Sequence, residues 1–97
     1  MGNPNLSDSA NAALIEISKD MTPEQLAGVE SSALEAYATT VARLRDARKR
    51  IDVEGLIVSD SKGQPIPHPA LAIEKSLEAQ MRAWLTRYMP KPVRARR

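Results

Sequence analysis

The sequence contains no cysteine, which excludes disulfide bonds, thiolate metal sites and a cysteine nucleophile. It has a single histidine, His68, which stands between Pro67 and Pro69. Without a second histidine or a cysteine, His68 cannot complete a typical zinc site. The pattern therefore favours a loop histidine that caps the following helix or bonds to the backbone. The four scattered glycines form no phosphate-binding loop.

The acidic residues suggest no catalytic site either. The pairs Asp52/Glu54 and Glu74/Glu78 have the spacing to hold magnesium, but such pairs are more typical of solvated helix faces. No catalytic constellation is visible, so we expect a protein that is not an enzyme and that holds no metal or cofactor.

Aromatic residues are scarce: phenylalanine is absent, and the only aromatic side chains are Tyr37, Trp84 and Tyr88. A chain of 97 residues forms one domain at most, and it buries only about 60–65% of its unfolded surface. Such a thin core often gains stability by oligomerisation. No apolar run is long enough for a membrane span, and the first residues lack the features of a signal peptide, so we expect no membrane association.

Residues 30–54 contain no proline or glycine and are predicted to form one long helix of roughly 37 Å. Apolar residues recur in this stretch at alternating steps of three and four, which is the pattern of a helix with one buried face. Arg48 occupies the one position at which the pattern fails. The apolar positions are Leu34, Tyr37, Val41, Leu44 and Ile51.

Two shorter helical segments are predicted before residue 30. Ser7 or Ser9 is suited to cap a helix that continues to about Lys19. Residues 22–25, Thr-Pro-Glu-Gln, have the chemistry of a capping box with proline at the first helical position. Gly28 weakens this second helix by about 1 kcal/mol relative to alanine. Either the chain breaks there and restarts at Glu30, or one helix continues to Glu54; we favour the break.

Gly55 is a good stop signal for the long helix. Residues 56–67 are predicted to form a small, irregular β-hairpin that turns at residues 60–63. Pro65 and Pro67 lack a backbone N–H, so the second arm cannot lie in the centre of a sheet.

A last helix is predicted to open at Pro69, to run to about Met89 and to stop before Pro90. Its length nearly matches that of the first long helix, so the two are expected to pack antiparallel. Glu78 and Arg82 are spaced to form an ion pair within the helix. The apolar stripe, widened by Leu71 and Leu85, consists of Ile73, Leu77, Met81, Trp84 and Tyr88.

Charge is distributed unevenly along the chain. Residues 1–35 contain one lysine and six acidic residues, a net charge of −5, whereas residues 36–97 contain thirteen basic and six acidic residues, a net charge of +7. This asymmetry suggests contact with nucleic acid or an acidic partner, and the alternative is an ordinary mixed-charge surface.

The densest basic run, residues 43–50, does not present its charges on one helix face. Asp46 is spaced to pair with both Arg43 and Arg50, and Arg45, Lys49 and Asp52 form a second row, so part of the charge is expected to be neutralised within the helix. For this run, surface ion pairing is slightly favoured over phosphate contact. In the proline-broken tail, four basic residues have no acidic neighbour, which favours a polyanion contact. The candidate nucleic-acid-binding residues are Lys91, Arg94, Arg96, Arg97, Arg45 and Lys49.

The order of these parts resembles the small subunit of phage terminase. The shared features are a long helix with Ala36-Tyr37-Ala38 at its centre, Gly55, a hairpin around Lys62-Gly63, His68-Pro69 opening a second long helix, and Pro90 with Arg94. The resemblance covers residues 22–97. It implies a non-enzymatic DNA-packaging protein that forms rings, engages the viral genome and regulates the ATPase and nuclease of the large subunit. The chain departs from the family pattern in lacking a substantial N-terminal region.

We therefore predict an all-α fold: an antiparallel hairpin of long helices, with a small β-hairpin in the connection and a short helical segment before it. Residues 1–21 would form a flexible or helical arm, residues 22–89 the oligomerisation core, and residues 90–97 a basic tail. The expected partners are further copies in a ring, the large terminase subunit and double-stranded viral DNA, in the cytoplasm of a bacterial host. The alternative is a non-viral, dimeric helical-hairpin adaptor or DNA-binding regulator.

Overall fold

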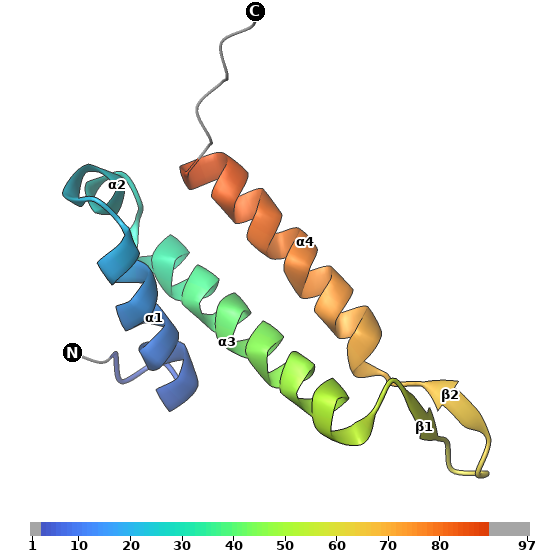
Figure 1. The fold of residues 1–97 in the computed structure, drawn as a ribbon. Helices are drawn as coiled ribbons and strands as arrows, with labels where there is room; N and C mark the ends of the chain where they lie inside the picture. Colours follow the sequence, from blue (N-terminus) through green and yellow to red (C-terminus); the bar gives the residue numbers. More distant parts are fainter. Residues whose placement is uncertain (1–2, 90–97) are drawn as a thin grey trace, which may run out of the picture.

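The computed structural model describes residues 3–89 and consists of helices joined by one small hairpin (Figure 1). The long helix α3 lies between α1 and α4, and α4 runs antiparallel to it. The predicted fold class is thereby confirmed. The elements in chain order are α1 (Asp8–Asp20), α2 (Pro23–Ala27), α3 (Ser31–Glu54), β1 (Ile57–Ser59), β2 (Pro65–Pro67) and α4 (Ala70–Tyr88).

The favoured break near Gly28 is present, and its cause is local. Thr22 and Gln25 form a full capping box, in which Gln25 N donates to Thr22 Oγ1 at 3.2 Å and Thr22 N donates to Gln25 Oε1 at 2.8 Å. The short helix α2 then ends at Gly28. Glu30 is extended, with φ −63° and ψ 145°, and α3 starts immediately after it. The turn that follows from this geometry lets α1 fold back along α3.

The β-hairpin begins where Gly55 stops α3. Gly55 has φ 91°, in the region that favours glycine, and its N–H donates to Ile51 O at 2.7 Å. β1 and β2 pair antiparallel, with Val58 opposite Ile66. In the turn, Asp60 Oδ1 accepts the backbone N–H groups of Lys62 at 2.8 Å and Gln64 at 2.9 Å. The predicted hairpin is confirmed, with both prolines in a two-stranded sheet that has no central strand.

The core has two parts along α3. The part near α1 centres on Ala13, Tyr37, Ala38 and Val41, against which half-buried side chains of α1 and α4 pack. The part near the β-hairpin is smaller and consists of Ala47, Ile51 and Ala70 with Leu71. Because α1 reaches only the first part, the end of the helical hairpin next to β1 and β2 is a two-helix structure (Figure 1).

Most of the two predicted apolar stripes lie in or beside this core. Leu44 is the largest side chain that is fully buried, with 2% of its surface exposed. The half-buried members of the stripes are Leu34, Met81, Trp84 and Tyr88. Ile73 is the exception: it is 53% exposed and does not take part in the core of a single chain.

Arg48, the polar position in the α3 stripe, faces α4. Its Nε donates to Glu74 Oε2 at 3.3 Å, and its Nη2 donates to Glu78 Oε2 at 2.9 Å. Glu78 was predicted to pair with Arg82 within α4, and this was wrong: along residues 3–89, its one ion pair is with Arg48. Glu74 therefore lies on the face of α4 that contacts α3, between Ala70 and Leu77. Ile73 lies outside that face.

The molecule is flat. Its principal extents are 53 × 47 × 17 Å, so it is about three times as long and as wide as it is thick. Domains usually enclose a core between at least two layers of secondary structure. Here α1, α3 and α4 lie side by side (Figure 1), so the long helices of residues 3–89 form a single layer.

Candidate nucleic-acid and self-assembly surfaces

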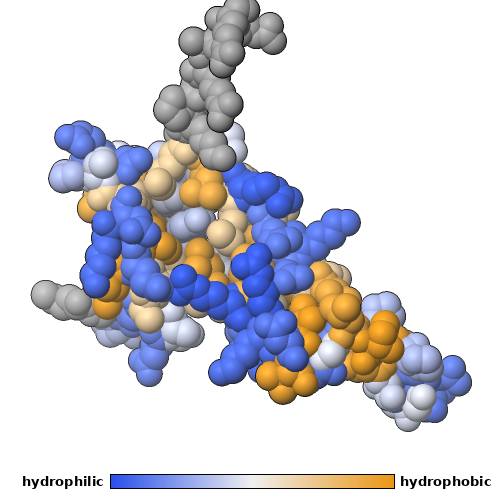
Figure 2. All heavy atoms as spheres, viewed as in Figure 1, coloured by the Kyte–Doolittle hydropathy of each residue, from blue (hydrophilic) through white to orange (hydrophobic). Residues whose placement is uncertain are grey.

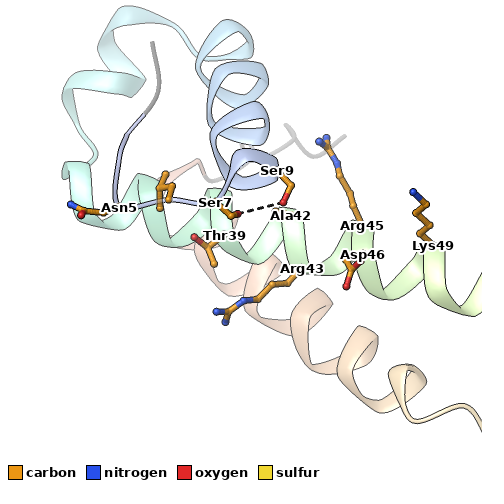
Figure 3. Close-up of a pocket in the computed structure, with 10 residues that line it drawn as sticks. Asn5, Ser7, Ser9, Thr39, Ala42, Arg43, Arg45, Asp46 and Lys49 are labelled. Carbon is orange, nitrogen blue, oxygen red and sulfur yellow. Dashed lines mark hydrogen bonds between the residues drawn. The ribbon is translucent and has the colours of Figure 1, made fainter.

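A polar groove of about 690 Å³ lies between the residues that lead into α1 and the middle of α3 (Figure 3). It includes two of the candidate nucleic-acid-binding residues, Arg45 and Lys49. One wall comes from the chain before and at the start of α1, and the other from α3. The lining residues are Asn5, Leu6, Ser7, Ser9, Thr39, Ala42, Arg43, Arg45, Asp46 and Lys49.

The first wall is held in place by Asn3 and Asn11. Asn3 N donates to Asn11 Oδ1 at 2.6 Å, and Asn11 Nδ2 donates to Asn3 O at 3.0 Å and to Leu6 O at 3.3 Å. Ser7 then caps α1, because its Oγ accepts the N–H of Ala10 at 3.2 Å. The sequence pattern predicts the cap but not this wall. The available signal was Asn11, a poor helix former placed where it reaches back to the preceding turn.

The basic side chains of α3 leave the helix in two directions. Arg45 and Lys49 extend on the α1 side, whereas Arg43 extends away from it (Figure 3). Arg45 forms an ion pair with Glu16 of α1. Lys49 has no ion-pair partner within residues 3–89, so its charge is available to a ligand. The two predicted rows are present, and an acidic residue of another helix partly neutralises one of them.

The row of Arg43, Asp46 and Arg50 is only partly neutralised. Arg50 Nε donates to Asp46 Oδ2 at 3.1 Å, and both side chains are exposed. Asp46 was predicted to be able to pair with Arg43 as well, but the structure shows only the pair with Arg50. Arg43 therefore joins Lys49 as a basic group without an acidic partner in residues 3–89.

A second, more apolar groove of about 710 Å³ lies between α3 and α4, next to the β-hairpin. We call it the hairpin-end groove. Charged and polar residues of both helices border it, including Arg43, Asp46, Arg50 and His68. Its apolar lining consists of Ala47, Pro69, Ala70, Ala72, Ile73 and Leu77.

Large apolar side chains are exposed around this end of the molecule. Besides Ile73, the exposed fractions are 77% for Val53, 60% for Leu56 and 61% for Ile57. Figure 2 shows apolar residues gathered between the helical body and the polar tip of the hairpin. Contiguous apolar surface of this kind marks an interaction site more often than a free surface.

The three aromatic side chains are packed against one another at the other end of the helical hairpin. The rings of Tyr37 and Trp84 stack with centroids 4.1 Å apart, and Tyr88 lies against Trp84 at 4.8 Å. Trp84 Nε1 donates to Ala33 O at 2.9 Å, which fixes the indole between α3 and α4. Burial raises the pKa of Tyr37. This cluster joins the two long helices, and the stacked pair offers no free ring face between them for a nucleic-acid base.

His68 caps α4, as its position predicted. Its Nδ1 accepts the N–H of Ala70 at 2.9 Å, and its Nε2 lies 2.8 Å from Glu54 Oε1. The side chain is a structural link between the end of α3 and the start of α4. Residues 3–89 contain no group of three or more histidine, cysteine or carboxylate side chains placed to hold a metal ion.

The four tail residues predicted to bind nucleic acid, Lys91, Arg94, Arg96 and Arg97, lie outside the described residues. The profile of a protein family described as phage terminase, small subunit, matches residues 10–97. The chain belongs to the phage terminase small subunit family. No curated protein and no solved structure matches it significantly.

As a phage terminase small subunit, the protein is a component of phage DNA packaging and acts within the infected host cell. Small subunits of this family are generally non-catalytic. The match also removes support from the alternative of a non-viral adaptor. Along the part of the chain that the structure describes, no helix combines the length and the apolarity needed to cross a bilayer.

Proposed function

We propose that this small subunit assembles into a ring of identical copies, contacts viral DNA through phosphate groups, and regulates the large terminase subunit in the cytoplasm of a bacterial host. Residues 22–89 form the assembly core, and residues 90–97 form a basic tail that each copy contributes. The observation that carries the proposal is the match to the small-subunit family over residues 10–97.

Two features of the single chain support assembly. The molecule is only 17 Å thick, and its helices form a layer with uncovered faces. Four large apolar side chains near the hairpin are more than half exposed. Identical subunits that cover one another's apolar surface remove this exposure, and a head-to-tail contact that closes on itself gives a ring. Light scattering at micromolar concentration tests this: a mass of 10.6 kDa, that of one chain, contradicts the ring.

Phosphate contact is supported by the distribution of charge. Residues 36–97 carry a net charge of +7, including four basic tail residues without an acidic neighbour in the sequence. Lys49 adds a charge in the polar groove, and Arg45 lies beside it. Because the proposed contact is with phosphate and not with base edges, binding should depend little on sequence and steeply on salt. In a ring, weak contacts from many copies combine.

A salt titration of duplex DNA affinity tests the contact. Deleting residues 91–97 should weaken binding and flatten the dependence of affinity on salt, by about 0.9 in slope for each phosphate that the protein no longer neutralises. Lys49→Ala should produce the same kind of change on a smaller scale. Lys75→Ala is the matched control, because Lys75 is an exposed lysine of α4 outside the polar groove.

The outcomes separate two roles for the tail. If the truncation changes neither the affinity nor its salt slope, the tail does not contact DNA. A tail that instead docks on the large subunit would lower the co-purification of the two subunits when it is deleted. If Lys49→Ala and Lys75→Ala have equal effects, the polar groove has no special part in DNA binding.

A further inference from the structure

We infer that the hairpin-end groove of one copy binds the amino-terminal apolar face of the next copy, defined here as Leu14, Ile15 and Leu34. The inference rests on the proposed ring and assigns its contact. The two surfaces are different, so the contact is head-to-tail. Each copy then uses its groove for one neighbour and its amino-terminal face for the other.

The hairpin-end groove lacks a third helix. At the other end of the helical hairpin, α1 packs over α3 and completes a three-helix core with Ala13, Tyr37 and Val41. Near the β-hairpin, α3 and α4 are the only helices of residues 3–89, and Leu77 and Ile73 line an open groove there. Ile73 is 53% exposed there. Another helical surface packed into this groove would supply the missing layer and bury Ile73.

The amino-terminal apolar face is the second uncovered apolar site. Leu14, Ile15 and Leu34 line a shallow hollow of about 430 Å³ between α1 and α3, together with Ser18 and Lys19. Ile15 is 39% exposed. The residues of this face lie in the second half of α1 and at the start of α3, whereas those of the hairpin-end groove lie in the second half of α3 and the first half of α4. These parts of the helices are at opposite ends of the molecule (Figure 1). One copy therefore cannot bring its own two surfaces together.

Charge favours a copy of this chain as the occupant of the groove. Arg43, Asp46 and Arg50 border the groove; Asp46 pairs with Arg50, so Arg43 is the basic group there without an acidic partner in residues 3–89. The segment that carries the amino-terminal face is acidic as a whole, since residues 1–35 have a net charge of −5, while Lys19 is the charged residue that lines the hollow itself. An apolar centre, combined with opposite overall charge on the two partners, favours a specific protein interface. The apolar lining argues against DNA as the occupant of this groove.

The inference is tested with two single variants that each remove one surface. Ile73→Asp places a charge in the groove, and Ile15→Asp places one on the amino-terminal face. Both residues are exposed in the single chain, so each variant should retain its helical circular dichroism. Ala79→Asp is the control, because Ala79 is exposed on α4 outside both surfaces. We expect each test variant to have the mass of one chain, 10.6 kDa, and the control to keep the wild-type mass.

Mixing the two test variants gives the decisive result. Each variant retains the surface that the other lacks, so an equimolar mixture should form a dimer with one good contact and no larger species. A wild-type mass for Ile73→Asp overturns the inference, as does a mixture that stays monomeric. If Ile73→Asp keeps the assembly but no longer binds the large subunit, the groove belongs to that subunit instead. A monomeric wild type contradicts the ring itself, which is a different outcome.

Discussion

The Nδ1 atom of His68 accepts the backbone N–H of Ala70 at 2.9 Å. Because Nδ1 is an acceptor, the proton of the neutral ring is on Nε2, which donates to Glu54 Oε1 at 2.8 Å. The ring is 7% exposed. One side chain thus satisfies a helix-terminal N–H of α4 and connects it to the last residue of α3.

Replacing His68 by alanine removes both bonds and should destabilise the protein by about 1–3 kcal/mol. His68→Asn should cost less, because its side-chain oxygen can still accept the Ala70 N–H. Glu54→Gln, which keeps an acceptor for Nε2, is the control and should cost under about 1 kcal/mol. Urea unfolding measures all three. Equal stability of His68→Ala and wild type would show that the cap contributes nothing.

Leu44 should be the most sensitive apolar position of α3, because its exposed fraction is 2%. Leu44→Ala leaves a cavity between the helices and should cost roughly 2–5 kcal/mol. Val53→Ala, at a position in the same helix that is 77% exposed, is the matched control and should change stability little in the single chain. A loss below about half a kcal/mol for Leu44→Ala in a denaturant melt would remove Leu44 from the core.

The elements of the fold were predictable because their signals are local. The capping box at Thr22, the glycine stop at Gly55 and the prolines of the hairpin act within a few residues of their own positions. The break before α3 was predicted on the same basis. In each case, the local interaction that the sequence predicted is the one that the structure shows.

The contacts between elements were less predictable, because they depend on which neighbour covers a given face. Periodicity placed Ile73 in the apolar stripe of α4. In the structure, Glu74 takes the place on the face toward α3, because Arg48 lies opposite it. The pairing of Arg45 with Glu16 depends on α1 folding back along α3, and residues 29 positions apart show no periodic relation. The polar groove was missed for the same reason: its amino-terminal wall forms only when α1 has docked.

Tyr37 should make stability depend on pH in alkaline solution. Burial raises its pKa in the folded protein, whereas an unfolded tyrosine titrates at about 10. Above that pH the unfolded chain loses the proton first, so it binds fewer protons than the folded chain and stability falls as pH rises. The contribution is fully present below about pH 10 and is lost as pH passes through the raised value.

Tyr37→Phe removes this titration, so the stability of the variant should fall less steeply as the pH rises. Urea unfolding of both proteins between about pH 8 and pH 11 measures it. The stability difference between wild type and variant should be constant at the lower pH values. At the higher pH values the wild type should lose more stability than the variant. A constant difference over the whole range would contradict a raised pKa for Tyr37.

Arg48 should contribute little to stability despite its two carboxylate partners. It bridges Glu74 and Glu78 of α4, but about half of its side-chain surface is exposed, so water and salt screen the attraction. Arg48→Ala should cost under about 1 kcal/mol, and part of that loss should be repulsion between the two glutamates, which are four residues apart on one helix. Adding Glu78→Gln to Arg48→Ala should therefore recover part of the loss. Repeating the denaturant melts in about 1 M salt, where charges are screened within about 3 Å, should bring Arg48→Ala close to wild type. A loss of about 3 kcal/mol or more that persists in salt would instead mean that the ion pairs behave as buried ones, so that removing Arg48 leaves uncompensated carboxylates between the helices.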